Sequence, residues 1–163
     1  MATTLADLAV PPEHVMLDTN VLLAATDEGR QTHRAALEVI GKWPGKGTTL
    51  YVSGQILREY LAVATRPIEQ DGLGMRPADA VSNVRALRDR ATLLAENVPV
   101  ADRLLALMRD VACRGKQVHD ANVVATMLAH SVSTVVTANA TDFTRYAQFI
   151  GVVTFGPVDG SPR

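Results

Sequence analysis

The stretch that decides the fold is HVMLDTNVLLAA, residues 14–25. Apolar residues fill both ends of it, but Asp18, Thr19 and Asn20 interrupt the middle. An ionised carboxylate that leaves water without a partner is strongly destabilising. Either a turn exposes Asp18, or another part of the chain supplies its partner. The apolar run before Asp18 predicts a short buried strand, residues 15–17, that ends at the Asp-Thr-Asn turn.

The composition is that of a globular protein. The chain has 163 residues, which predicts a single domain over 1–163, and 47% of them are hydrophobic, enough for a substantial core. The net charge of −1 gives no overall positive field, so nucleic-acid binding requires a local basic patch. The single cysteine, Cys113, excludes an intrachain disulfide and suits a reducing compartment. We find no secretory signal and no apolar run of the roughly 18 residues that a membrane span needs, and expect a cytoplasmic protein.

Short apolar strands alternate with helices along the chain. We predict strands at residues 15–17, 50–53, 97–100, 133–137 and 151–157, the last closed by Gly156-Pro157. We predict helices at residues 21–25, 31–42, 55–65, 78–95, 102–114 and 120–130, and one helical turn at 141–146. Residues 66–77, with two prolines and two glycines, form a loop. This alternation is typical of an α/β fold, a three-layer α/β/α sandwich with a central parallel sheet.

Polar side chains follow two of the predicted strands directly. Asp18 follows the first strand, and Thr137, Asn139 and Asp142 lie at or just beyond the end of strand 133–137. Ligands of open parallel sheets bind beyond the carboxyl ends of the strands. These side chains are therefore neighbours if the two strands pair.

Two further acids lie on predicted helices. At about 100° per residue, Asp120 falls near the middle of the apolar stripe of its helix, although a role as N-cap explains it equally well. Glu59 lies at the edge of a buried helix face, and Arg58 does so equally. Spacing alone therefore favours a solvated Glu59 on the helix surface.

Four stretches together resemble a known family. MLDTNVLL, SGQILREYLAV, VHDANVVATMLAH and VVTANATDF, spread from Met16 to Phe143, occur in the order and approximate spacing of PIN-domain ribonucleases. The size and the acid pattern are most similar to the VapC toxins of type II toxin–antitoxin systems. The resemblance implies a parallel sheet between helices. It also implies four catalytic acids: Asp18, Glu59, Asp120 and Asp142. Many relatives carry an acid near Asn139, so either Asn139 or Asp142 faces the metal.

Clustered carboxylates require a cation. Two of them about 4 Å apart repel by roughly 4 kcal/mol at an effective dielectric near 20. Oxygen ligands suit Mg²⁺ or Mn²⁺, and the sequence offers no Cys or His cluster for zinc. We expect Asp18 and Asp120 to be the principal metal ligands, with Glu59 and Asp142 bound directly or through water. The metal would activate the water that attacks an RNA phosphodiester.

Other side chains are candidates for supporting roles. Thr19, Asn20, Thr137 and Asn139 could contact the acids or the substrate, although ordinary turn chemistry explains the last two equally well. Arg114, Lys116 and Arg145 lie near the acids in sequence and are candidates for phosphate contacts. The resemblance also implies an antitoxin partner and a homodimer. Apolar stripes on helices 31–42 and 78–95 could receive an antitoxin helix.

Several alternatives compete with this interpretation. A free-standing RNA-processing PIN nuclease would have the same site, and a catalytically inactive PIN-like binding module is disfavoured because all four acids are present. A phosphoacceptor domain needs an acidic pair after the first strand, and a haloacid-dehalogenase-like phosphatase needs D-x-D-x-T. A Rossmann domain needs G-x-G-x-x-G after that strand. The sequence has none of the three.

Overall fold

The computed structural model describes residues 1–155. The strands of its one sheet are β1 (Thr3–Thr4), β2 (His14–Leu17), β3 (Thr49–Ser53), β4 (Ala91–Leu94), β5 (Thr134–Thr137) and β6 (Gly151–Thr154). The α-helices are α1 (Thr19–Thr26), α2 (His33–Lys42), α3 (Gly54–Thr65), α4 (Pro77–Arg88), α5 (Val98–Asp110), α6 (Gln117–Ala129) and α7 (Ala140–Phe143). Short 3-10 helices are η1 (Leu5–Asp7), η2 (Pro44–Lys46), η3 (Ile68–Gln70) and η4 (Thr144–Tyr146).

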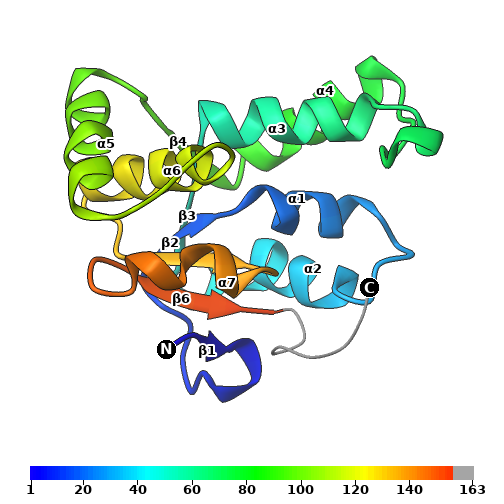
Figure 1. Ribbon diagram of the computed structural model, residues 1–163. Coiled ribbons are helices and arrows are strands. Elements are labelled where there is room, and N and C mark those ends of the chain that lie inside the picture. Colours follow the sequence, from blue (N-terminus) through cyan, green and yellow to red (C-terminus); the bar gives the residue numbers. More distant parts are fainter. Residues whose placement is uncertain (156–163) are drawn as a thin grey trace.

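The sheet is parallel throughout, with strand order β1-β6-β5-β2-β3-β4. From β2 the chain moves outward through β3 to β4, then returns past β2 to β5 and continues in the opposite direction to β6. Because such crossovers are right-handed, α1 to α4 cover one face and α5 to α7 cover the other. Figure 1 shows these two groups of helices on either side of the strands. The predicted three-layer α/β/α sandwich is confirmed.

The apolar half of the opening stretch forms the centre of this core. Val15, Met16 and Leu17 on β2 are fully buried, as are Val135 and Val136 on the neighbouring β5. Burial on both faces explains why these strands are continuous apolar runs without alternation. β2 therefore ends with Asp18 at the rim of a fully packed core.

Two predictions in the middle of the chain are wrong. The helix predicted over 78–95 ends at Arg88, and residues 91–94 form β4, which pairs with β3 from Leu50↔Ala91 to Ser53↔Leu94. The open edge of β3 offers hydrogen bonds that outweigh the helical spacing of these apolar residues. The strand predicted over 97–100 is instead the start of α5, because Pro99 fits the first turn of a helix, where its missing N–H is not needed. The helix predicted over 102–114 accordingly spans Val98–Asp110.

Smaller differences concern the ends of elements. β1 was not predicted, α1 begins two residues early at Thr19, and α6 begins three residues early at Gln117. The loop 66–77 contains η3. The predicted closure of the last strand at Gly156-Pro157 lies outside the described residues. Over residues 1–155, none of the helices combines the length and apolar character that crossing a bilayer requires.

Candidate functional site

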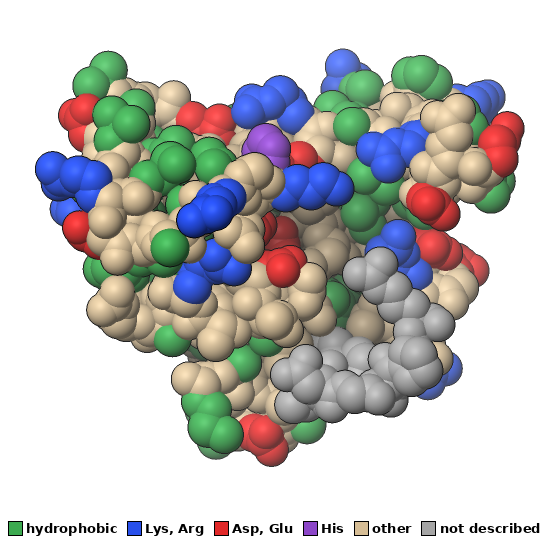
Figure 2. Space-filling view, viewed as in Figure 1, with side chains coloured by type: hydrophobic (Ala, Val, Ile, Leu, Met, Phe, Trp, Pro, Cys, Tyr) green, Lys and Arg blue, Asp and Glu red, His purple; other side chains and the backbone are tan. Residues whose placement is uncertain are grey.

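The site lies where two central strands end side by side. β2 pairs with β5 through Leu17↔Val136, and the Asp18 N–H donates to the Val136 carbonyl at 3.0 Å. The chain leaves these strands in opposite directions, toward β3 and toward β6, which opens a crevice at their carboxyl ends. The two strands do pair, so the polar side chains that follow them are neighbours. Figure 2 shows acidic side chains gathered in a central hollow with Lys and Arg side chains around it.

Asp18 receives its partners from both strand ends. It is the N-cap of α1, and its Oδ1 accepts the Thr19 N–H at 2.7 Å. Its Oδ2 accepts from Asn20 Nδ2 and from the Thr137 hydroxyl, each at 2.7 Å. Burial nevertheless raises the pKa of Asp18 to about 6; the bonds from Thr137 and Thr19 oppose this shift, and the charges of Glu59 and Asp142 add to it. The carboxylate is held in place but carries a charge that its surroundings do not neutralise.

Thr137 and Asn20 hold the two strand ends together. The Thr137 side chain is fully buried, and its hydroxyl also accepts from Asn20 Nδ2 and from the Asn139 N–H, both at 3.0 Å. The Asn20 Oδ1 accepts the Ala138 N–H at 2.9 Å. Both side chains therefore orient Asp18.

Glu59 points toward the site. It is partly buried, its Oε2 accepts from the Thr19 hydroxyl at 2.8 Å, and its Oε1 accepts from Gln55 Nε2 at 2.8 Å. Arg58, the other candidate at that edge, is exposed and pairs with Glu96 at 3.4 Å. The expectation of a solvated Glu59 is therefore wrong. The Thr19 hydroxyl links Glu59 to the turn that carries Asp18.

Asp120 lies inside the first turn of α6. The N-cap of that helix is Lys116, so the capping interpretation of Asp120 is wrong. The pKa of Asp120 is raised to about 6, mainly by burial and also by the charges of Asp142, Asp18 and Glu59, whereas Arg145 opposes the rise. Acids from three other segments of the chain thus act on the Asp120 carboxyl group.

Asp142 and Asn139 are a linked pair at the outer side of the site. Both are exposed, and Asn139 Nδ2 donates to Asp142 Oδ2 at 2.5 Å. The negative charge of Asp142 raises the pKa of both Asp18 and Asp120. Asp142 therefore contributes the charge at this end of the site, and Asn139 supports its carboxylate.

The donor set fits a hard divalent cation bound partly through water. Within residues 1–155, no three Asp, Glu, His or Cys side chains lie close enough to hold one ion by themselves. Mg²⁺ keeps several of its waters and takes only one or two carboxylates directly, so Asp18 and Asp120 are sufficient as direct ligands. Burial raises both pKa values most, and the neighbouring carboxylates add to the rise through a repulsion that such an ion would relieve.

The basic candidates lie near the beginning of α6. Arg114, Lys116 and Arg145 are exposed. Arg145 Nη1 donates to the Ala112 carbonyl at 2.9 Å, and its charge acts on Asp120. Among these three basic residues, Arg145 is the one whose charge lowers the pKa of Asp120.

Sequence reasoning missed Gln55, whose buried side chain contacts Glu59. The available signal was its position four residues before Glu59, which places both side chains on one face of α3.

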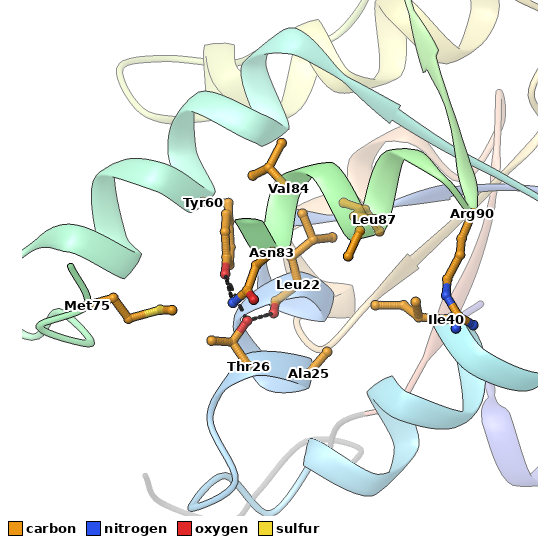
Figure 3. Close-up of a pocket in the computed structure, with 11 residues that line it drawn as sticks. Leu22, Ala25, Thr26, Ile40, Tyr60, Met75, Asn83, Val84, Leu87 and Arg90 are labelled. Atoms are coloured by element: carbon orange, nitrogen blue, oxygen red, sulfur yellow. Dashed lines mark hydrogen bonds between the residues drawn. The ribbon is translucent and has the colours of Figure 1, made fainter. Parts of the chain in front are cut away.

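A separate cavity of about 380 Å³ lies among α1, α2, α3 and α4. Figure 3 shows its lining of apolar side chains, among them Ile40, Val84 and Leu87, with a hydrogen-bonded group of Thr26, Tyr60 and Asn83 at one side. The four acids do not line it.

Comparison with known families leads to the same conclusion as the sheet topology and the acids at its central strand ends. The PIN domain model matches residues 15–148, and the chain belongs to the PIN domain family. It is 27% identical over 135 residues to Ribonuclease VapC24 of Mycobacterium tuberculosis, a match that covers 80% of this chain and 89% of that protein. The resemblance to PIN-domain and VapC proteins predicted from four short stretches is confirmed.

Solved structures share the fold at lower identity. A toxin–antitoxin complex from Klebsiella pneumoniae aligns with a TM-score of 0.60 and 22% identity, over 88% of this chain and 99% of that one. VapC20 of Mycobacterium tuberculosis, a toxin that cleaves the sarcin–ricin loop, aligns with a TM-score of 0.60 and 16% identity, over 83% of this chain and 95% of that one.

Proposed function

We propose that this protein is a metal-dependent endoribonuclease and the toxin of a type II toxin–antitoxin pair. The observation that carries the proposal is the gathering of four acids near the ends of β2 and β5: the charges of Glu59 and Asp142 raise the pKa of Asp18, and those of Asp142, Asp18 and Glu59 raise the pKa of Asp120. The relatives named ribonuclease and toxin support it.

The chain's own residues would hold the metal and place the RNA. Asp18 and Asp120 would bind Mg²⁺ or Mn²⁺ directly, with Glu59 and Asp142 reached directly or through water. The bound ion would supply a Lewis acid and an activated water for phosphodiester hydrolysis. Asn20 and Thr137 keep the Asp18 oxygens in one orientation.

Basic side chains would bind the polyanion on the side of the α6 N-terminus. Arg145, with Arg114 and Lys116, would contact phosphates flanking the scissile bond. The clustered carboxylates at the ends of β2 and β5 would repel the phosphates of RNA. We therefore expect RNA binding close to these acids to depend on the bound cation.

The deciding experiment is RNA cleavage by the purified protein. Transfer and ribosomal RNA are incubated with Mg²⁺, with Mn²⁺ or with a chelator, alongside Asp18→Asn as a control that keeps the size of the side chain. We expect discrete cleavage only in the presence of metal and none by the variant. Equal cleavage by the variant would contradict the proposal.

The same proposal includes an antitoxin, which the solved toxin–antitoxin complex of similar fold supports. The apolar cavity among α1 to α4 (Figure 3) is its proposed docking place, because Ile40 on α2 and Val84 and Leu87 on α4 belong to the two helices whose stripes suit a partner helix. Growth arrest on expression, relieved by the product of an adjacent gene, separates a toxin from a free-standing RNA-processing enzyme.

A further inference from the structure

A buried glutamine joins the two helices that carry Glu59 and Asp120. Gln55 lies in the first turn of α3 and is 6% exposed. Its Nε2 donates to Glu59 Oε1 at 2.8 Å and to the His119 carbonyl at 3.0 Å, while its Oε1 accepts from Asn122 Nδ2 at 2.7 Å. Both N–H bonds and the carbonyl of the amide are used. A flipped amide would face two acceptors with its oxygen, so the orientation of this side chain is fixed.

The contacts on α6 lie on both sides of Asp120. His119 precedes Asp120, and Asn122 follows it by two residues. Gln55 is therefore hydrogen-bonded to the turn of α6 that carries this acid. On the other side, the second oxygen of Glu59 accepts from the Thr19 hydroxyl. A continuous series of hydrogen bonds therefore runs from α1 through α3 to α6 and connects the supports of three acids.

We propose that Gln55 is a positioning residue for the divalent cation: it sets the separation of the Glu59 and Asp120 carboxylates. This inference rests on the proposed function, because it concerns the same metal. Ionised Glu59 and Asp120 carry like charges, which repel each other. Without a neutral crosslink, α3 and α6 could relax apart. Groups that orient metal ligands from behind typically contribute about 10- to 100-fold to metal affinity.

The test compares Gln55→Met with a matched control. Methionine keeps the length and flexibility of the side chain but removes all three hydrogen bonds. The control, Glu96→Ala, removes a bond of similar length at the same turn of α3, because Glu96 Oε1 accepts the Gln55 N–H at 3.0 Å. Glu96 touches none of the four acids in the hydrogen bonds of residues 1–155.

The main readout is the Mn²⁺ dissociation constant of the full chain from titration calorimetry, with the free energy of unfolding measured beside it. We expect Gln55→Met to bind Mn²⁺ at least about 10-fold more weakly than wild type and Glu96→Ala to stay within about twofold. In RNA cleavage, Gln55→Met should lower kcat with little change in KM, and excess Mn²⁺ should restore kcat.

Each result has a distinct meaning. Wild-type protein that binds no Mn²⁺ would refute the proposed function itself. Wild-type affinity in Gln55→Met, with only a loss of stability like that of Glu96→Ala, would overturn the positioning role alone. If Gln55→Met does not fold, Gln55→Asn replaces it, because an amide one methylene shorter cannot reach both Glu59 and α6; the same 10-fold loss is expected, and unchanged affinity overturns the inference.

Discussion

Replacing Asp18 with asparagine is expected to flatten the pH dependence of stability of the metal-free protein. The folded protein holds the Asp18 proton more tightly than the unfolded chain does, because burial raises its pKa from 3.8 to about 6. A raised pKa gives a contribution to stability that is fully present below the unfolded pKa and is lost as pH rises through the folded pKa. Metal-free wild type therefore loses stability between about pH 4 and pH 7.

The size of the loss follows from the shift. At about 1.4 kcal/mol per pKa unit, Asp18 contributes roughly 3 kcal/mol over the whole range, of which roughly 2 kcal/mol falls between about pH 4.5 and pH 7.5. For a chain of this size that is about 4–8 °C in Tm. Asp120, which is half exposed, adds a smaller amount in the same direction. The asparagine keeps one oxygen that can accept the Thr19 N–H, but its amino group cannot accept from Asn20 Nδ2 and the Thr137 hydroxyl. The cost of roughly 1 kcal/mol does not change with pH.

The assay is urea unfolding of wild type and Asp18→Asn at a series of pH values in the presence of a chelator. The quantity to compare is the difference between the two pH profiles, because histidines and surface acids contribute equally to both. Saturating Mn²⁺ should reverse the wild-type trend, since the ion binds the ionised carboxylates and releases their protons.

Parallel profiles for wild type and Asp18→Asn would refute the reasoning. They would mean that Asp18 titrates as it does in the unfolded chain, and that its bonds to Thr137, Asn20 and the Thr19 backbone fully compensate its burial. A wild-type stability that rises with pH in the chelator would do the same.

Four further perturbations test separate parts of the site. Asp120→Asn should fold but lose cleavage by about 100-fold or more and lose the rise in Tm on adding Mn²⁺, as followed by fluorimetry. Thr137→Val removes the bonds of the hydroxyl to Asp18 Oδ2, Asn20 Nδ2 and the Asn139 N–H and should lower the free energy of unfolding by about 1–3 kcal/mol in urea titrations. Arg145→Ala should weaken RNA binding and reduce the slope of log K against log salt by about one, measured by fluorescence anisotropy with the cleavage-defective variant. Val84→Lys should abolish co-purification with the product of the adjacent gene while leaving RNA cleavage unchanged.

The sequence predicted the layers and the two strand ends well, because buried parallel strands are continuous apolar runs that few other structures produce. The prediction failed where the same pattern of apolar residues fits both a helix and a strand. Residues 91–94 continue the helical spacing of the preceding helix, and only the open edge of β3 selects a strand there. Pro99 was a local signal for a helix start that the apolar residues around it obscured.

In the candidate site, too, one residue could be predicted from the sequence and another could not. Asp18 could be located from its interruption of an apolar run, which is a property of the sequence alone. The choice between Glu59 and Arg58 depends on which neighbours lie across the interface, namely Thr19 and Gln55 for one and Glu96 for the other. Spacing within one helix cannot contain that information.

The order of the strands has a consequence for protein synthesis. β5 is among the last strands in the chain, yet it lies beside β2 in the middle of the sheet and supplies the hydroxyl and the carbonyl that hold Asp18. A nascent chain that has reached residue 130 already contains Asp18, Glu59 and Asp120 but still lacks β5, whose Thr137 hydroxyl and Val136 carbonyl hold Asp18. The full set of four acids, with the β5 contacts that orient Asp18, can therefore assemble only after translation has passed Asp142.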